Sequence, residues 1–147
     1  MTDNDGFGNN LVWLSVLVQR RYAQICADHN LTTVQATLLC VIKDQPQGMG
    51  ELAQVLGVAK NALSGLVDRM ERRGLVQRES LQRDRRAVTL STTAQGKEIV
   101  SALYADVAER MPDIAGALPA EEQHRLADAV ARIAAPALLT TSPAPQR

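Results

Sequence analysis

The chain has 147 residues with 16 basic and 16 acidic side chains, so its formal net charge is zero. This length fits one domain with its own core, or a small domain together with dimerisation helices. No apolar run approaches the roughly 18 residues that a membrane span needs, and the polar residues 1–10 predict no secretory signal.

The sequence also argues against catalysis. It has no glycine-rich phosphate loop, no nucleophile elbow and no metal-ligand signature, and its two histidines, His29 and His124, lie in different segments without an acidic motif partner. We therefore expect neither an enzyme nor a bound cofactor. Cys26 and Cys40 lie in apolar stretches, which is typical of reduced thiols in a cytoplasmic protein.

The first predicted element is a long amphipathic helix over residues 11–30, preceded by a flexible segment at residues 1–10. Leu11, Leu14, Val18, Tyr22 and Ile25 follow one another at steps of three and four residues. Further apolar side chains beside this stripe widen it to two faces: Val12, Trp13, Val16 and Leu17. One face is expected to pack within the subunit and the other on a partner subunit.

The middle of the chain has the pattern of a helix-turn-helix. Thr32 and Gln35 have the spacing of a capping box at the start of a second helix, which "DQPQG" ends. Two short helices then flank Gly57, and the second of them stops at Gly74, a residue typical of helix C-termini.

A β-hairpin is predicted directly after this motif. Residues 75–80 and 87–91 have strand character, and the polar loop "LQRDRR" separates them. A helix-turn-helix followed by a hairpin is a winged helix. A helix that starts at Thr92 or Thr93 and a last helix after Pro119 follow, and the Pro/Ser/Thr-rich end of the chain predicts disorder.

The predicted fold class is therefore mainly α with a small β-hairpin wing: a winged helix-turn-helix plus dimerisation helices. Residues 31–91 form the expected DNA-binding core. Residues 11–30 and 92–136 form the dimerisation helices, and residues 137–147 form the disordered tail.

One face of the helix before Gly74 suits contact with DNA. On a helical wheel its outer side carries short polar residues, with Asn61 and Ser64 in the first turns and Lys60 at the flank. A recognition helix needs small, hydrogen-bonding side chains there to approach base edges. An ordinary solvated helix face explains these residues equally well when they are considered alone.

The charge distribution favours the DNA-binding interpretation. Residues 60–86 contain eight basic and four acidic side chains, a net charge of +4 that the rest of the chain balances with −4. Such segregation is what phosphate contact requires, and arginine suits a narrow minor groove. The alternative explanation is that Arg72 and Arg73 are favoured at the C-terminus of a helix by its dipole, and we accept it for Arg73. It does not explain the three arginines of the loop, Arg83, Arg85 and Arg86.

The segment "GELAQVLGVAKNALSGLVDRMERRGLVQRESLQRDRRAVTLSTTAQG" resembles the DNA-binding core of the MarR family of transcriptional regulators. The end of the wing, "DRRAVTLSTTAQG", matches the family pattern at Asp84, Arg86, Thr93 and Gly96. The likeness extends over residues 11–135. Two positions depart from it: Ala59 replaces the usual hydroxyl residue at the N-cap of the recognition helix, and Thr92 replaces a leucine.

The resemblance implies a homodimer that binds a pseudopalindromic operator in double-stranded DNA, most often as a repressor. Its two recognition helices would read half-sites about 34–36 Å apart. Lys60, Asn61 and Ser64 would contact the major groove. Arg86, helped by Arg83 or Arg85 and oriented by Asp84, would enter the minor groove. Thr33 and Gln35 would touch phosphate at a helix N-terminus.

The resemblance also implies an effector, in this family commonly a small phenolic or lipophilic molecule held between the dimerisation helices and the winged helix. The residues expected to line that site are Trp13, Leu17, Arg20, Arg21, Tyr22 and Cys40, together with Ile42. Cys26 and His29 share a helix face and would seed a metal site, but the sequence supplies no further ligands, so we predict none. Oxidant sensing by Cys26 is disfavoured, because oxidant-sensing members carry their cysteine near the start of the first helix.

Two other functions remain open at this point. A winged helix can serve as a protein-interaction module whose wing grips an acidic partner. The chain can also be a regulator that has lost direct contact with DNA, an idea that Ala59 and Gly65 support slightly. Binding to a specific duplex in the presence of competitor DNA distinguishes both from a DNA-binding regulator.

Overall fold

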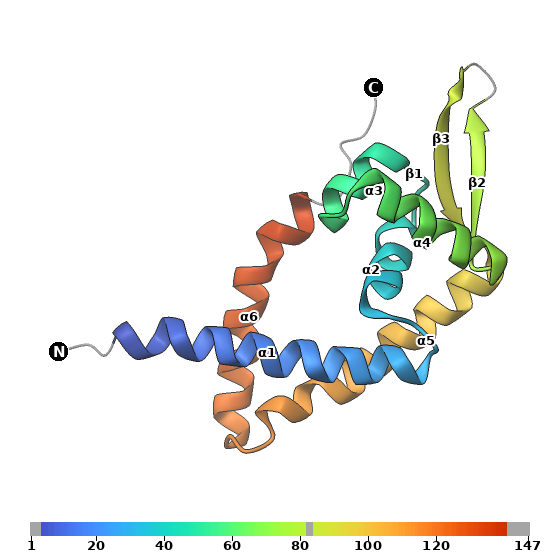
Figure 1. Ribbon diagram of the computed structural model, residues 1–147. Coiled ribbons are helices and arrows are strands. Elements are labelled where there is room, and N and C mark those ends of the chain that lie inside the picture. Colours follow the sequence, from blue (N-terminus) through green and yellow to red (C-terminus); the bar gives the residue numbers. More distant parts are fainter. Residues whose placement is uncertain (1–3, 82–83, 141–147) are drawn as a thin grey trace. The chain divides into compact units, whose positions relative to one another are not determined.

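The computed structural model describes residues 4–81 and 84–140, and the side chains of residues 6–80 and 87–136 (Figure 1). In chain order the elements are α1 (Asn4–Asp28), α2 (Thr33–Ile42), β1 (Gln47–Gly48), α3 (Met49–Leu56), α4 (Lys60–Arg72), β2 (Val76–Leu81), β3 (Asp84–Thr92), α5 (Ala94–Arg110), the 3₁₀ helix η1 (Met111–Ala115) and α6 (Ala120–Thr140). The predicted fold class, mainly α with a small wing, is confirmed.

The chain divides into two compact units, Met1–Met111 and Pro112–Arg147. The second unit contains most of η1 and the whole of α6, a helix with Pro136 inside it. Leu126, Val130 and Ile133 are exposed along α6. The helix continues to Thr140, four residues into the segment expected as a tail, and residues 141–147 lie outside the described residues.

Helix α1 begins seven residues earlier than the sequence predicts. Residues 4–10, expected to be flexible, form its first two turns although they include two glycines. Extending an existing helix adds one hydrogen bond for each residue that becomes ordered, so polar residues of low propensity can continue a helix that they would not start.

Helix α2 begins at the predicted capping box. The Gln35 backbone N–H donates to Thr32 Oγ1 at 3.2 Å, and the Thr32 N–H donates to Gln35 Oε1 at 3.0 Å. Two backbone donors at the helix start are thereby satisfied. The capping box therefore fixes the direction in which the chain enters α2, the first helix of the winged helix.

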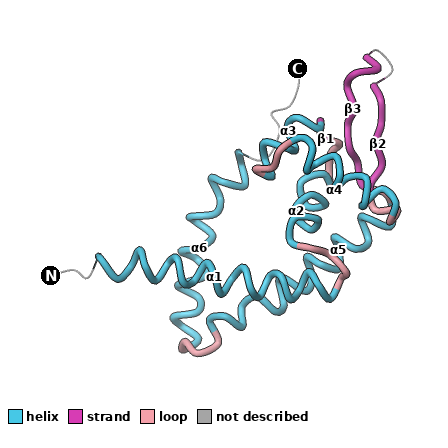
Figure 2. The backbone as a smooth tube through the Cα atoms, viewed as in Figure 1, coloured by secondary structure: helices cyan, strands magenta, loops and turns pink. Residues whose placement is uncertain are grey.

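The three strands form one antiparallel sheet in the order β1-β3-β2, and β2 and β3 extend away from the helices as the wing (Figures 1 and 2). The two-residue strand β1, paired through Gln47 with Leu90, was not predicted, since two residues carry no alternation. Strand β2 extends to Leu81 and strand β3 begins at Asp84 rather than at Ala87, so both strands reach into the segment expected as a loop. Residues 82 and 83 lie outside the described residues.

The core of the first unit is aliphatic, as the low aromatic content predicts. Its fully buried side chains come from α1, α2, α3, α4, β2, β3 and α5; the largest are Ile25, Leu38, Leu39, Ile42, Leu52, Leu63, Met70, Leu75, Leu90 and Leu103. This core holds α4 and the base of the wing in one unit with α1 and α5. Among the described residues no single helix is long and apolar enough to cross a membrane, and α1 and α2 satisfy such a test only as a pair bent by 79°.

Candidate nucleic-acid interface

Helices α3 and α4 are joined by a turn that depends on glycine. Gly57 adopts a φ of 65°, a left-handed conformation that side chains disfavour, and the Val58 N–H then donates to the Ala53 carbonyl at 3.1 Å. The chain re-enters a helix after Ala59, whose extended backbone serves as the N-cap without a side-chain hydrogen bond. The first amides of α4 therefore keep their hydrogen-bonding capacity for another acceptor.

The two faces of α4 are chemically distinct. Leu63, Leu66, Val67 and Met70 are buried in the core, which fixes the rotation of the helix about its axis. The opposite side exposes the predicted residues of the first turns: Lys60, Asn61 and Ser64. The structure therefore brings these three side chains together on one exposed surface at the N-terminus of α4, as predicted.

The wing carries the other predicted contacts, and only part of it is described. Arg83 lies outside the described residues, and Asp84, Arg85 and Arg86 are placed by their backbone alone at the start of β3. Asp84 pairs with Leu81 whereas Val88 pairs with Ser80, so three extra residues on β3 form a bulge. Two of these three are the arginines. A bulge at a strand end re-aims side chains and increases the local twist.

Arg78, at the base of the wing, turns toward α4 instead of away from it. Its guanidinium lies 2.7 Å from Asp68 Oδ1 and 3.2 Å from Glu71 Oε1, and its backbone N–H donates to Glu71 Oε2. The sequence interpretation counted Arg78 within the basic segment and missed these contacts. No sequence pattern reveals a pairing between a helix and the strand that follows it.

Gln35 and Thr33 are less available than predicted for a phosphate. Gln35 Oε1 already accepts from the Thr32 backbone and from Arg73 Nη1 at 3.4 Å, while Thr33 is half-buried. The pair of Arg73 and Gln35 links the end of α4 to the start of α2. Arg73 therefore makes a tertiary contact in addition to its expected place at the helix end.

The motif at the end of the wing attaches α5 to the winged helix. Thr93 Oγ1 accepts from the Gly96 N–H at 3.1 Å, as a helix N-cap, and donates to the Gly74 carbonyl. A Cβ atom at Gly96 would lie 2.1 Å from the Leu75 carbonyl oxygen, so only glycine fits. The motif thus joins the end of the recognition helix to the first turn of α5.

Comparison with known proteins agrees with this architecture. Residues 29–87 match the model of the MarR family. This segment of the chain is therefore similar to the MarR family. The repressor NicR of Pseudomonas putida, an HTH-type transcriptional repressor, is 31% identical over 83 residues, which are 56% of this chain and 52% of NicR. The matched segment therefore spans about half the length of that relative.

Solved structures of MarR family proteins share the fold over most of the chain. A C80S mutant of MarR from E. coli superposes with a TM-score of 0.78 at 23% identity, covering 86% of this chain and 94% of that one. The repressor CouR bound to a 23-mer DNA duplex gives a TM-score of 0.71 at 26% identity, covering 86% and 91%. Tm0710 of Thermotoga maritima gives 0.68 at 27% identity, covering 88% and 92%.

Outside the recognition helix, the first unit of the chain has a cavity of about 190 Å³. It is lined by Tyr22, Cys40, Leu103, Tyr104 and Val107. The Lys43 ammonium lies 4.2 Å from the centroid of the Tyr104 ring. Burial raises the pKa of both tyrosine hydroxyls, so they are protonated hydrogen-bonding groups at neutral pH.

Two of the predicted effector residues, Tyr22 and Cys40, line this cavity. The other predicted residues do not: Trp13, Leu17 and Arg20 are exposed, Arg21 donates to the Arg110 carbonyl at 3.4 Å, and Ile42 is buried in the core. The lining that the prediction missed comes from α5, whose Leu103 and Val107 lie one helical turn apart.

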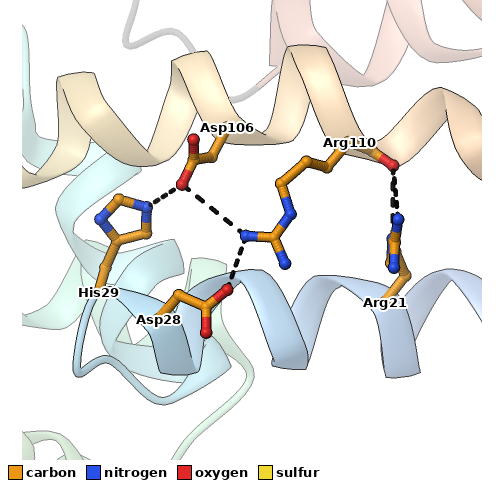
Figure 3. Close-up of polar contacts among 5 residues, drawn as sticks. All are labelled: Arg21, Asp28, His29, Asp106 and Arg110. Carbon is orange, nitrogen blue, oxygen red and sulfur yellow. Dashed lines mark hydrogen bonds and ion pairs between the residues drawn. The ribbon is translucent and has the colours of Figure 1, made fainter.

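A polar cluster fastens the end of α1 to α5 (Figure 3). His29 Nε2 lies 2.7 Å from Asp106 Oδ2, and Arg110 Nη1 lies 2.7 Å from Asp28 Oδ2 and 3.9 Å from Asp106 Oδ2. Arg21 adds its contact to the Arg110 carbonyl from about two turns earlier on α1. His29 therefore has a carboxylate partner, which sequence reasoning missed because 77 residues separate the two.

The two thiols lie in apolar surroundings. Cys26 is fully buried and Cys40 is half-buried, and burial raises the pKa of both. A raised pKa leaves little thiolate at neutral pH, which opposes oxidation. Within the described parts of the chain, no group of three or more His, Cys, Asp or Glu side chains is placed to hold a metal ion.

Proposed function

We propose that the chain is a homodimeric, ligand-responsive repressor of transcription that binds a pseudopalindromic operator in double-stranded DNA. The observation that carries this proposal is the exposed group of Lys60, Asn61 and Ser64 at the N-terminus of α4, in the same compact unit as a wing whose bulge holds Arg85 and Arg86. Short polar side chains read base edges, and arginines suit a narrow minor groove. These side chains therefore support DNA binding rather than catalysis.

The relatives support the same function. NicR is by name a transcriptional repressor, and CouR is a repressor seen on a DNA duplex. NicR is similar to this chain in sequence over 83 residues and CouR is similar to it in fold, and we extend their activity to it. Because DNA is the target, the site of action is the cytoplasm, where the two thiols stay reduced.

A second copy of the chain is the proposed cover for the apolar side chains of α1. Trp13 is 68% exposed, and Val12 and Leu17 are each more than half exposed on the same helix. A monomer rarely leaves so many large apolar side chains in water. We assign residues 11–30 and 92–136 to dimerisation and residues 31–91 to DNA binding, so that two recognition helices meet two half-sites.

The effector is proposed to enter the cavity between Tyr22, Cys40 and Tyr104. Its volume of about 190 Å³ exceeds the roughly 150 Å³ in which an engineered apolar cavity holds benzene. Aliphatic walls and two tyrosine hydroxyls suit a small phenolic molecule. Val107→Trp should fill the cavity, so that the variant binds DNA but no longer releases it when phenolic compounds are added.

The deciding experiment is fluorescence anisotropy of the purified protein on duplex DNA from beside its own gene. Specific binding should fall steeply with salt and should survive an excess of nonspecific duplex. Binding that competitor DNA abolishes would instead favour a winged helix that contacts an acidic protein partner. Absence of any binding would favour a regulator that has lost its contact with DNA.

Arg86→Ala tests the wing directly. Removal of one minor-groove arginine should weaken operator binding by about 1–3 kcal/mol and lower the slope of log K against log salt by about one unit. Anisotropy titrations at several salt concentrations measure both quantities. Unchanged affinity and slope would remove Arg86 from the interface.

A further inference from the structure

Arg78, in strand β2, makes three hydrogen bonds to two acidic side chains of α4. Its guanidinium contacts Asp68 at 2.7 Å and Glu71 at 3.2 Å, and its main-chain N–H donates to the other oxygen of Glu71, also at 3.2 Å. The Arg78 side chain is only 29% exposed. A planar guanidinium suits such a fork between two carboxylates, and charge-assisted hydrogen bonds of this kind are stronger than neutral ones.

The elements that these contacts join are the two that must meet DNA together. Asp68 and Glu71 lie three residues apart on the same face of α4, and Arg78 lies on β2 opposite Leu90 of β3. Leu90 is fully buried in the core. The base of the wing is therefore held to the C-terminal half of the recognition helix on one side and to the core on the other.

The contacts also reduce the negative charge that Asp68 and Glu71 place on α4. Asp68 and Glu71 lie on the helix that is proposed to approach DNA phosphates, where unpaired carboxylates would be repelled. Arg78 offsets one of the two negative charges, and the hydrogen bond that it donates to Asp68 raises the pKa of its guanidinium. Lys60, Arg69 and Arg72 remain exposed on α4.

We propose that Arg78 is a positioning residue that fixes the wing against the recognition helix and so sets how well the protein distinguishes its operator from other DNA. The proposal rests on the proposed function. Tight binding to an operator requires the helix to contact the major groove while the wing contacts the minor groove. Both contacts form together only if the helix and the wing are held at a fixed distance from each other. Nonspecific binding uses phosphates alone and tolerates a loose wing.

Three variants separate positioning from phosphate contact. Arg78→Gln removes the fork, Arg78→Lys keeps the charge but cannot bridge both carboxylates as a planar fork does, and Arg72→Gln removes a charge from an exposed arginine whose Nε donates within α4 to the Asp68 carbonyl. Affinities for operator and for nonspecific duplex are measured for each across a range of salt.

Positioning predicts that Arg78→Gln lowers the ratio of operator to nonspecific affinity by about tenfold, with the salt slope unchanged. Arg78→Lys should lose part of that ratio, and Arg72→Gln should leave it at the wild-type value. The proposal is overturned if Arg78→Gln weakens both duplexes equally and lowers the slope by about one unit while Arg78→Lys behaves as wild type, because that is the behaviour of a phosphate contact. An unchanged ratio in Arg78→Gln also overturns it.

A measurement without DNA keeps this test independent of the proposed function. Hydrogen exchange of the free protein should be faster in residues 76–80 and 87–92 of Arg78→Gln, with α1 and α5 unchanged. Asp68→Asn combined with Glu71→Gln should produce the same acceleration, and adding Arg78→Gln to that pair should add little. Unaltered hydrogen exchange in the wing would contradict the positioning role of Arg78. A wild-type protein that binds no specific DNA would contradict the proposed function alone.

Discussion

At Gly96 the first turn of α5 touches the backbone of Leu75 so closely that no side chain fits. A Cβ atom there would lie 2.1 Å from the Leu75 carbonyl oxygen, and backbone cannot move aside as a flexible side chain can. The residue thus fixes how the recognition helix and α5 are joined. At Gly65, by contrast, the nearest atom to an added Cβ is Arg69 Nη1 at 3.8 Å.

Gly96→Ala should therefore lower the free energy of unfolding by about 1–3 kcal/mol, because the contact must open to admit the methyl group. Gly65→Ala is the matched control within another helix. It should raise stability by about 0.5–1 kcal/mol, since alanine has the higher helix propensity and room is available. Urea unfolding of both variants measures the two changes in the free energy of unfolding. Equal changes at the two glycines would contradict the close contact at Gly96.

Ionisable groups in the core give the protein a pH dependence on the alkaline side. Burial raises the pKa of Tyr22, Cys26 and Cys40 above their ordinary values, with the neighbouring thiols adding to the effect on Tyr22. Their contribution to stability is present below the pKa of the unfolded chain, about 8.5 for cysteine and 10 for tyrosine. It is lost as the pH rises through the raised pKa values of the folded state.

Urea midpoints should therefore fall between about pH 8 and pH 10.5. Tyr22→Phe removes the phenol and keeps the ring, so the midpoint of this variant should fall less over the same range. A wild-type midpoint that stays constant across these pH values would show that burial does not perturb the three groups.

Among the elements, α2 and α4 begin in opposite ways. Helix α2 has a complete capping box, whereas α4 starts at Ala59, which has the backbone geometry of an N-cap and no side-chain acceptor. The recognition helix thus lacks the interaction that stabilises its neighbour. An uncapped first turn leaves amides that a DNA phosphate can satisfy.

Ala59→Ser should stabilise the protein by about 1 kcal/mol, because the serine hydroxyl can accept from an amide of the first turn. Thr32→Ala, which removes the hydroxyl from the capping box of α2, should destabilise by a similar amount. Thermal unfolding of the two variants measures both changes. If Ala59→Ser has no effect on stability, the first turn of α4 is satisfied by some other group.

For the whole molecule, the exposed apolar side chains of α1 are the proposed contacts of a dimer. If the proposed dimer forms, Trp13→Glu should convert it into a monomer, and the mass in sedimentation equilibrium should fall from about twice 15.9 kDa to 15.9 kDa. A charge in an apolar interface that cannot pair it is strongly unfavourable. Val55→Glu, at an exposed apolar residue of α3, should stay dimeric. Dissociation of both variants, or of neither, would remove α1 from the proposed interface.

The order of the elements follows from local signals in the sequence. The capping box at Thr32, the stop at Gly74, the break between Pro112 and Pro119 and the step from helical to alternating pattern at residue 75 each act within a few residues, so one sequence suffices to find them. The family motif at Asp84, Arg86, Thr93 and Gly96 was recognised in the same way.

Only the tertiary structure decided which groups the charged and small residues contact. The sequence contains Arg78, Asp68 and Glu71 but does not say that one fork joins them, nor that His29 meets Asp106 across 77 residues. It marks Gly96 as part of a motif without revealing the carbonyl that excludes a side chain. Charges and backbone contacts act through space, whereas helix caps and hydrophobic periods act along the chain. The sequence by itself therefore determined the order of the long helices and of the wing, and the fold determined their contacts.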